Sequence, residues 1–309
     1  MSSDTHVSVL RCEAVEALDI VSDGRYVDAT YGRGGHSLKI IEQLGESGRL
    51  LAIDRDPDAL ADAERRFHDD QRFNIVSANF ADIDHVVEQR EWVGTVDGLL
   101  LDLGVSSPQL NVAKRGFGFS RDGLLDMRMD PLTGVSAAQW LADVREEDLV
   151  HVLKTYGEER YARRIAAAIV AARDVTPITR TMQLAEIVKA AHPRWERHHH
   201  PATRSFQAIR IQVNGELDAI SQVLAKATSV LKKGGRLVVI SFHSLEDRLV
   251  KHALRTPPPP AGLPRHLPLP ETQPHPWKVL SKAIKASDEE LARNPRARSA
   301  VMRVAQRIV

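Results

Sequence analysis

Short apolar segments alternate with amphipathic ones through the first hundred residues of the chain. Four segments have the apolar character of buried strands: Tyr26–Ala29, Leu50–Asp54, Phe73–Val76 and Val96–Leu103. Between the first three, residues 37–44 and about 58–67 place apolar side chains at helical spacing. Strands that alternate with helices predict an α/β protein with a parallel sheet and helical crossovers.

The same alternation returns late in the chain. A helical pattern over residues 217–231 ends at Lys232–Gly235, whose two glycines predict a helix stop, and the apolar strand Arg236–Phe242 follows. Two candidate final strands flank a helix-like segment at 288–293, and these are Trp277–Leu280 and Ser299–Ala305. The predicted fold is therefore a Rossmann-like, mostly parallel sheet covered by helices.

A long interval separates the fourth strand from the fifth. About 130 residues lie between Leu103 and Arg236, whereas a strand, helix and strand together need roughly 30. The excess predicts an inserted, mainly helical domain at 111–214, within a core made of 1–110 and 215–309. One of its helices has an apolar face made by Tyr161, Ile165, Ala168, Ile169 and Ala172, with arginines on another face. Because ligands of such sheets bind beyond the carboxyl ends of the strands, this insertion is placed to recognise a substrate.

Composition narrows the class of protein. Hydrophobic residues make up 43% of the 309, and the apolar runs fall short of the roughly 18 residues that a membrane helix needs. The first residues have no signal-peptide pattern, and Cys12 is the only cysteine. We expect a cytoplasmic protein with no membrane partner and no metal. Nine of the 16 prolines lie in 257–276, which predicts an extended loop.

Charge is unevenly distributed along the chain. The segment 111–214 holds 16 Lys and Arg against 12 Asp and Glu, a net charge of +4 in a chain whose total is +1. A polyanionic partner of this segment fits that balance, although charged helix faces are most often only solvated.

The segment Tyr26–Ser37 carries the strongest local signal. A short strand leads into Gly32, Gly34 and Gly35, and an apolar-periodic helix follows, with Ser37 as its expected N-cap. This geometry brings backbone amides to a nucleotide-like ligand. The third glycine of the dinucleotide motif is missing, which disfavours a dinucleotide as the ligand.

Polar residues follow the next strands at the same predicted sheet edge. Asp54 ends the second strand, 22 residues after Gly32, where a carboxylate can accept hydrogen bonds from both ribose hydroxyls. Phe80 follows the third strand and can pack on an adenine, or belong to the core. Asp102 ends the fourth strand, and Gln109 can bind a base-like edge; a turn cap and a surface amide are the alternatives.

Basic and aromatic residues are interleaved where the insertion begins. The pattern around Arg115 and Arg128 suits single-stranded nucleic acid, because bases stack on rings and guanidinium groups bind phosphates; a structural hinge is the alternative. Arg204, Arg296 and Arg298 are further candidate RNA contacts. The Ser-His pairs around His243 invite a hydrolase interpretation, but the chain lacks a G-x-S-x-G elbow.

Six motifs occur together in one order: Tyr26–Ser37, Asp102–Gln109, Asp126–Asp130, Phe206–Arg210, Ser241–Arg248 and Asn294–Ser299. In this combination the chain resembles the RsmH (MraW) family. The resemblance implies a class I S-adenosylmethionine-dependent methyltransferase that modifies the N4 amine of a cytosine in the decoding region of 16S ribosomal RNA, in the small ribosomal subunit.

The resemblance also assigns the residues that would bind S-adenosylmethionine: Gly34, Gly35, His36, Asp54, Phe80, Asp102 and Gln109. The first three would line the methionine part, Asp54 would hold the ribose and Phe80 would lie by the adenine. The chain departs from the family at Ser8 and Leu124, neither of which we expect to touch a cofactor contact.

The resemblance leaves the catalytic group open, with Asp102 and His243 as candidates. A nicotinamide-dependent oxidoreductase and an inactive RNA-binding assembly factor are the alternative functions. The sequence determines no oligomeric state and leaves a homodimer open.

Overall fold

The computed structural model describes residues 8–194, 200–256 and 275–309, so most of the predicted proline-rich loop lies outside the described residues. The chain divides into two compact units. Unit 1 comprises Met1–Gly104 and Leu217–Val309, and unit 2 comprises Val105–Glu216. The predicted boundaries at 110 and 214 lie a few residues from these.

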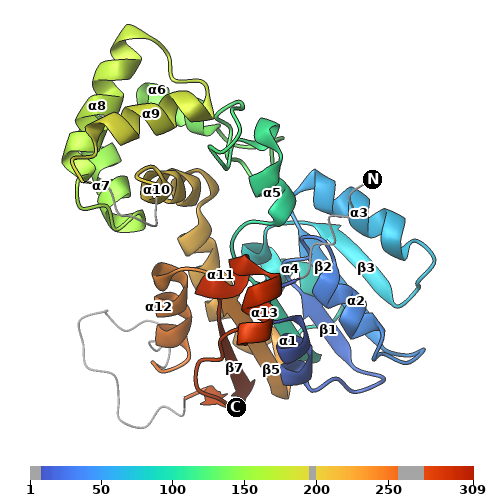
Figure 1. Cartoon of the computed structure of the whole chain (residues 1–309). Coiled ribbons are helices and arrows are strands. Elements are labelled where there is room, and N and C mark those ends of the chain that lie inside the picture. The colour runs from blue at the N-terminus through green and yellow to red at the C-terminus, as the bar shows by residue number, and fades with distance from the viewer. Residues whose placement is uncertain (1–7, 195–199, 257–274) are drawn as a thin grey trace. The chain divides into compact units, whose positions relative to one another are not determined.

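Unit 1 is built on one seven-stranded sheet (Figure 1), with the strands in the order β3-β2-β1-β4-β5-β7-β6. The strands are β1 (Arg25–Asp28), β2 (Arg49–Asp54), β3 (Phe73–Ser77), β4 (Val96–Asp102), β5 (Leu231–Ser241), β6 (Trp277–Val279) and β7 (Val301–Arg307). The first five pair in parallel, and β7 runs antiparallel to both β5 and β6. The predicted α/β fold with a mostly parallel sheet is confirmed.

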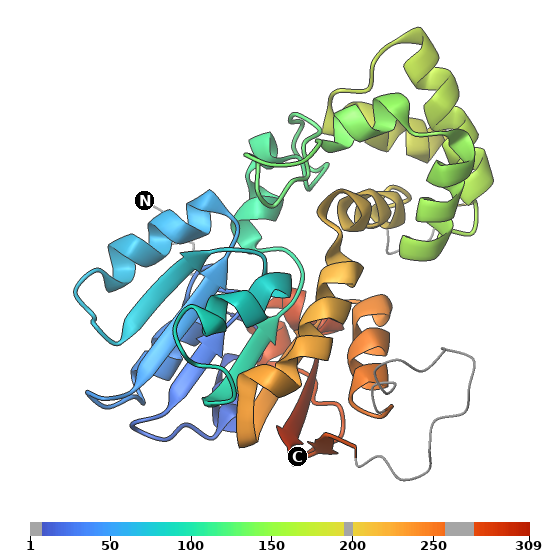
Figure 2. The same ribbon diagram turned by 180° about the vertical axis from the view of Figure 1, so that it is seen from behind.

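Helices cover both faces of this sheet. One face packs against α1 (Arg11–Leu18), α2 (Gly35–Ile41) and α3 (Pro57–Phe67). The other face, seen from behind in Figure 2, packs against α4 (Ile83–Glu88), α11 (Glu216–Val230) and α12 (Ser244–Ala253). Three short helices complete the unit: η1 (Phe80–Asp82), α13 (Asp288–Arg293) and η3 (Pro295–Ser299).

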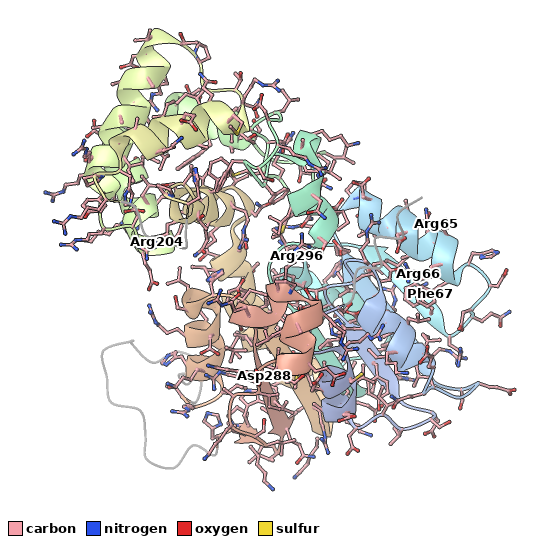
Figure 3. The ribbon with its side chains drawn as sticks, in the orientation of Figure 1. Arg65, Arg66, Phe67, Arg204, Asp288 and Arg296 are labelled. Atoms are coloured by element: carbon pink, nitrogen blue, oxygen red, sulfur yellow. The ribbon has the colours of Figure 1, made fainter. Side chains whose placement is uncertain are left out.

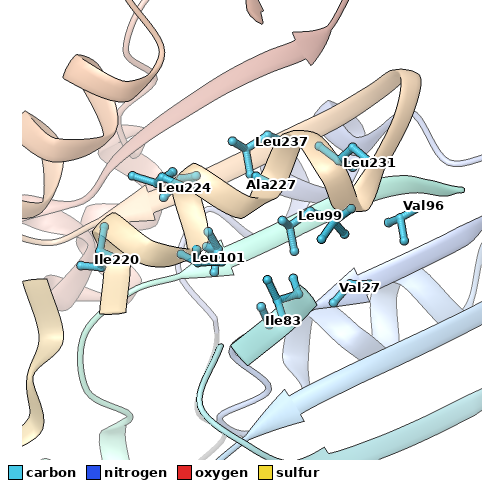
Figure 4. Close-up of a cluster of buried hydrophobic side chains, with 14 of the residues drawn as sticks. Val27, Ile83, Val96, Leu99, Leu101, Ile220, Leu224, Ala227, Leu231 and Leu237 are labelled. Carbon is cyan, nitrogen blue, oxygen red and sulfur yellow. The ribbon is translucent and has the colours of Figure 1, made fainter. Parts of the chain in front are cut away.

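The continuous leucines of β4 show why this strand is central. Leu99 and Leu101 belong to the cluster that includes Leu224 and Ala227 of α11 (Figure 4), whereas Leu100 belongs to the cluster on the opposite face. Successive side chains of a strand point to opposite faces, so a strand buried on both sides is apolar at every position.

Two local predictions in unit 1 are wrong. Helix α2 begins at Gly35 with Gly34 as its N-cap, so Ser37 lies inside the helix rather than at its start. Gly34 is left-handed, with φ +64°, a conformation that glycine adopts without strain. Lys232–Gly235 lies within β5, because α11 already ends at Val230 and the strand pairs with β4 from Leu231 onward across a register shift.

Unit 2 is helical, as predicted. Its helices are α5 (Ser107–Asn111), η2 (Ala113–Arg115), α6 (Ala137–Asp143), α7 (Glu146–Tyr156), α8 (Ala162–Val175), α9 (Thr181–Ala191) and α10 (Thr203–Asn214). Ile165 and Ile169 of α8 are buried in a core of this unit's own, and Arg163 and Arg164 are exposed. Over the described ranges, no helix has the length and hydropathy that crossing a membrane requires.

Candidate functional site

Three carboxylates mark the carboxyl edge of the sheet in unit 1. Asp28, Asp54 and Asp102 are the last residues of β1, β2 and β4, which are neighbours in the sheet. Parallel pairing brings these ends to one edge. Asp54 and Asp102 were predicted at this edge from the sequence, whereas Asp28 was not, although it also ends an apolar strand.

The glycine turn after β1 has no room for a side chain at Gly34 or Gly35. Gly32 and Gly34 have φ of +57° and +64°. A Cβ on Gly34 would lie 2.5 Å from the hydroxyl oxygen of Tyr31. A Cβ on Gly35 would collide with Ser8, so Ser8 does touch a residue of the predicted cofactor site, contrary to expectation.

Asp54 ties the end of β2 to this turn. Its two carboxylate oxygens accept hydrogen bonds from the backbone N–H of Gly32 at 2.8 Å and of Asp56 at 2.9 Å. Burial raises the pKa of Asp54, and the backbone hydrogen bonds oppose that rise. Asp54 therefore shapes the turn, and its ribose contact stays a prediction.

Asp28 is fully buried beneath the turn. Its carboxylate accepts a hydrogen bond from the hydroxyl of Ser37 at 2.6 Å and another from the backbone N–H of Thr30 at 3.2 Å. Burial raises the pKa of Asp28 to about 6, and the charge of Asp54 adds to the rise. Ser37 therefore binds the carboxylate of Asp28 and does not cap the helix.

Asp102 lies next to His36. Its Oδ2 is 3.7 Å from the His36 Nδ1, and the other ring nitrogen of His36 is 3.2 Å from the carbonyl oxygen of Val9. The Oδ1 of Asp102 is buried and has no hydrogen-bond partner in the described part of the chain. Burial raises the pKa of Asp102 well above its usual value, and the charges of Asp28 and Glu246 raise it further.

These features fit S-adenosylmethionine. The unpaired Oδ1 of Asp102 is a buried acceptor without a donor from the described chain, so a group that enters the site, cofactor or substrate, can supply one. Close-packed carboxylates repel one another and favour a cationic ligand such as a sulfonium. The glycine turn lets a ligand approach the backbone.

Phe80 begins the short helix η1 directly after β3. Its side chain is partly buried and packs against the core of unit 1. Asn79 caps this helix by accepting a hydrogen bond from the Ala81 N–H at 3.0 Å. The adenine contact of Phe80 stays a prediction.

His243 precedes helix α12, beside the fully buried Glu246. The Nε2 of His243 is 3.1 Å from one oxygen of Glu246, and the backbone N–H of Phe242 donates to the other oxygen at 2.7 Å. Glu246 thus links His243, which it contacts, to Asp102, whose pKa it raises.

Gln109 lies in unit 2. It is buried, and its side-chain oxygen accepts a hydrogen bond from the Ser106 N–H at 2.9 Å, which closes a capping box at the start of α5. This role in the helix is separate from the predicted role in cofactor binding, which stays a prediction.

The predicted RNA-contacting arginines occupy different environments. Arg115 is buried and donates to the carbonyl oxygen of Met129 at 2.9 Å. Arg128 is paired with Asp126 at 2.7 Å. The side chains of Arg204 and Arg296, labelled in Figure 3, are exposed and half-buried respectively, and Arg298 is exposed. Their RNA contacts stay predictions.

A family model and two curated relatives identify the same family. The model of the MraW methylase family matches residues 3–308. The chain is 54% identical to the ribosomal RNA small subunit methyltransferase H of Thioalkalivibrio sulfidiphilus, an alignment that covers 98% of this chain and 97% of that protein. It is 57% identical to the protein of the same name from Chromohalobacter salexigens, with 98% and 92% covered. Since the match spans nearly the whole sequence, the chain belongs to the MraW methylase family.

Proposed function

We propose that the protein transfers a methyl group from S-adenosylmethionine to the N4 amine of a cytosine in 16S ribosomal RNA. Membership of the MraW methylase family over residues 3–308 is the observation that carries this proposal. The relatives named small subunit methyltransferase H are more than half identical and nearly fully covered. The carboxylates and glycines assigned to the cofactor site are all present, which argues against an inactive assembly factor.

Gly34, Gly35 and His36 would hold the methionine part of the cofactor, and Asp54 would hold its ribose. When bound, S-adenosylmethionine supplies a methyl group on a positively charged sulfur. Asp54 is positioned for its task by the hydrogen bonds from Gly32 and Asp56, which fix the plane of its carboxylate. Phe80 would lie by the adenine.

The reacting amine needs help because its lone pair is delocalised into the cytosine ring. An acceptor that binds an N–H of this amine localises the lone pair and aligns it for attack. The Oδ1 of Asp102 is a buried, unused acceptor, and the raised pKa of this carboxyl suits it to take up a proton. The cytosine must leave its stack to reach such a buried group.

Replacement of Asp102 tests this role. We expect Asp102→Ala to abolish nearly all methyl transfer from labelled S-adenosylmethionine to small-subunit RNA. Asp97→Ala is the matched control, because Asp97 lies in the same strand near its opposite end, where its carboxylate accepts from the Arg25 N–H. Full activity of Asp102→Ala would exclude Asp102 as the group that orients the amine.

The ribosomal context is part of the proposal. With a substrate in the small ribosomal subunit, the protein would act in the cytoplasm. Methylation of free 16S RNA, compared with methylation of assembled subunits from cells that lack the protein, identifies the substrate form. Sedimentation equilibrium of the purified protein tests the homodimer. Titration calorimetry with S-adenosylmethionine and with NADH separates the proposal from the oxidoreductase alternative.

A further inference from the structure

Three arginines surround one buried carboxylate beside the glycine turn of unit 1. Asp62 lies on the inner side of α3 and is only 4% exposed. Arg65 is 2.5 Å from its Oδ1, Arg66 is 3.4 Å from its Oδ2, and Arg33 of the glycine turn is 3.8 Å from its Oδ1. Three positive charges and one negative charge leave a local net charge of +2.

The carboxylate positions these arginines without using most of their donors. Charge-assisted hydrogen bonds are about 2.7–2.9 Å long, so the distances of Arg33 and Arg66 leave their N–H groups to bind a further acceptor. Asp62 also accepts a hydrogen bond from the Tyr31 hydroxyl at 3.1 Å, which fixes its orientation. Among the described residues, Asp62 is the acid that pairs with these three arginines.

The arginines are accessible to a ligand. The side chains of Arg33, Arg65 and Arg66 are 33%, 77% and 39% exposed, and Figure 3 labels the last two on α3. Guanidinium groups match the geometry of phosphate oxygens. Arg33 directly precedes Gly34 of the predicted cofactor site, so a phosphate bound here would lie next to that site.

We propose that Arg33, Arg65 and Arg66, held by Asp62, form a binding site for a backbone phosphate of the RNA strand that carries the target cytosine. This inference rests on the proposed function. It differs from the positions predicted from sequence, because Arg33, Arg65 and Arg66 lie in the methyltransferase core rather than in the helical insertion.

The test compares Arg65→Ala/Arg66→Ala with Arg293→Ala. Arg293 is a matched control because it also lies in the last turn of a helix in unit 1, is 72% exposed, and pairs with an acid, Glu289, at 2.6 Å. Initial rates of methyl transfer are measured against the concentration of unmethylated small subunits, at several potassium chloride concentrations. Titration with S-adenosylmethionine is measured in parallel.

The double variant should raise the KM for subunits about ten-fold or more, the size of a lost charged hydrogen bond. Its affinity for subunits should depend less steeply on salt, by about 0.7 in the logarithmic slope for each lost phosphate contact. The affinity for S-adenosylmethionine and the kcat should stay within about two-fold of wild type, which a folding defect would not allow.

Two results would overturn the inference: a KM and salt slope equal to those of Arg293→Ala, or a loss confined to S-adenosylmethionine binding. The second result would assign the arginines to the cofactor. Failure of the proposed function itself would look different, because wild-type protein would then transfer no methyl group to any form of the RNA.

Discussion

Substitution of Gly34 by alanine should destabilise the protein in two ways, by backbone strain and by a steric collision of the added methyl group. Its φ of +64° is left-handed, which costs an L-residue about 1–2 kcal/mol. The new Cβ of Gly34→Ala would also lie 2.5–2.7 Å from the hydroxyl and ring atoms of Tyr31. Tyr31 is buried against Phe67 and Phe73 and bonded to Asp62, so it has no free space to move into.

Overpacking of a tight site costs about 1–3 kcal/mol, so we expect Gly34→Ala to lower the free energy of unfolding by about 2–5 kcal/mol in total. Gly134→Ala is the matched control: Gly134 has φ +69°, but nothing lies within 4 Å of its Cβ position. It should lose only the strain of about 1–2 kcal/mol. Urea denaturation measures both values, and calorimetry should show that only Gly34→Ala loses S-adenosylmethionine binding. Equal losses of stability in the two variants would refute the collision.

Three further predictions concern charge and packing. The pKa of Asp28 is raised from 3.8 to about 6 in the folded state. The folded protein therefore holds this proton more tightly than the unfolded chain does, and the free energy of unfolding should fall by about 3 kcal/mol as the pH rises from below 4 to above 6. Asp28→Asn removes this titration. Between pH 4.5 and 7.5 the free energy of unfolding, measured in urea, should therefore fall less in the variant than in wild type, by up to about 3 kcal/mol. Equal pH dependence of the two proteins would contradict the raised pKa. Leu101→Ala, in the core of unit 1, should lose about 2–5 kcal/mol, whereas Leu132→Ala, at a side chain 81% exposed, should change stability by less than about 0.5 kcal/mol. Because a cationic ligand favours ionised carboxylates, S-adenosylmethionine should bind more tightly as the pH rises from 5 to 7.5, and its binding near pH 6 should release protons. Calorimetry in buffers of different ionisation enthalpy measures this release, and a release of zero would refute the prediction.

Local sequence pattern was sufficient for the order of the strands and for several of the helices. Apolar runs of strand length and helical periodicity predicted all seven strands to within a few residues, apart from the early start of β5. It was also sufficient to bring Asp54 and Asp102 to one sheet edge, because the carboxyl ends of neighbouring parallel strands meet there. The family motifs added the cofactor and the substrate, which periodicity cannot supply.

Such patterns do not predict which residues of distant segments contact each other. Ser37 has the sequence position of a helix cap, but the fold brings its hydroxyl to Asp28, for which the sequence predicted no role. The arginines around Asp62 likewise come from the glycine turn and from α3, about 30 residues apart in the chain. Hydrophobic periodicity reports which face of each element is buried, whereas the partner of a buried polar group depends on how those elements pack, and only the tertiary structure determines that.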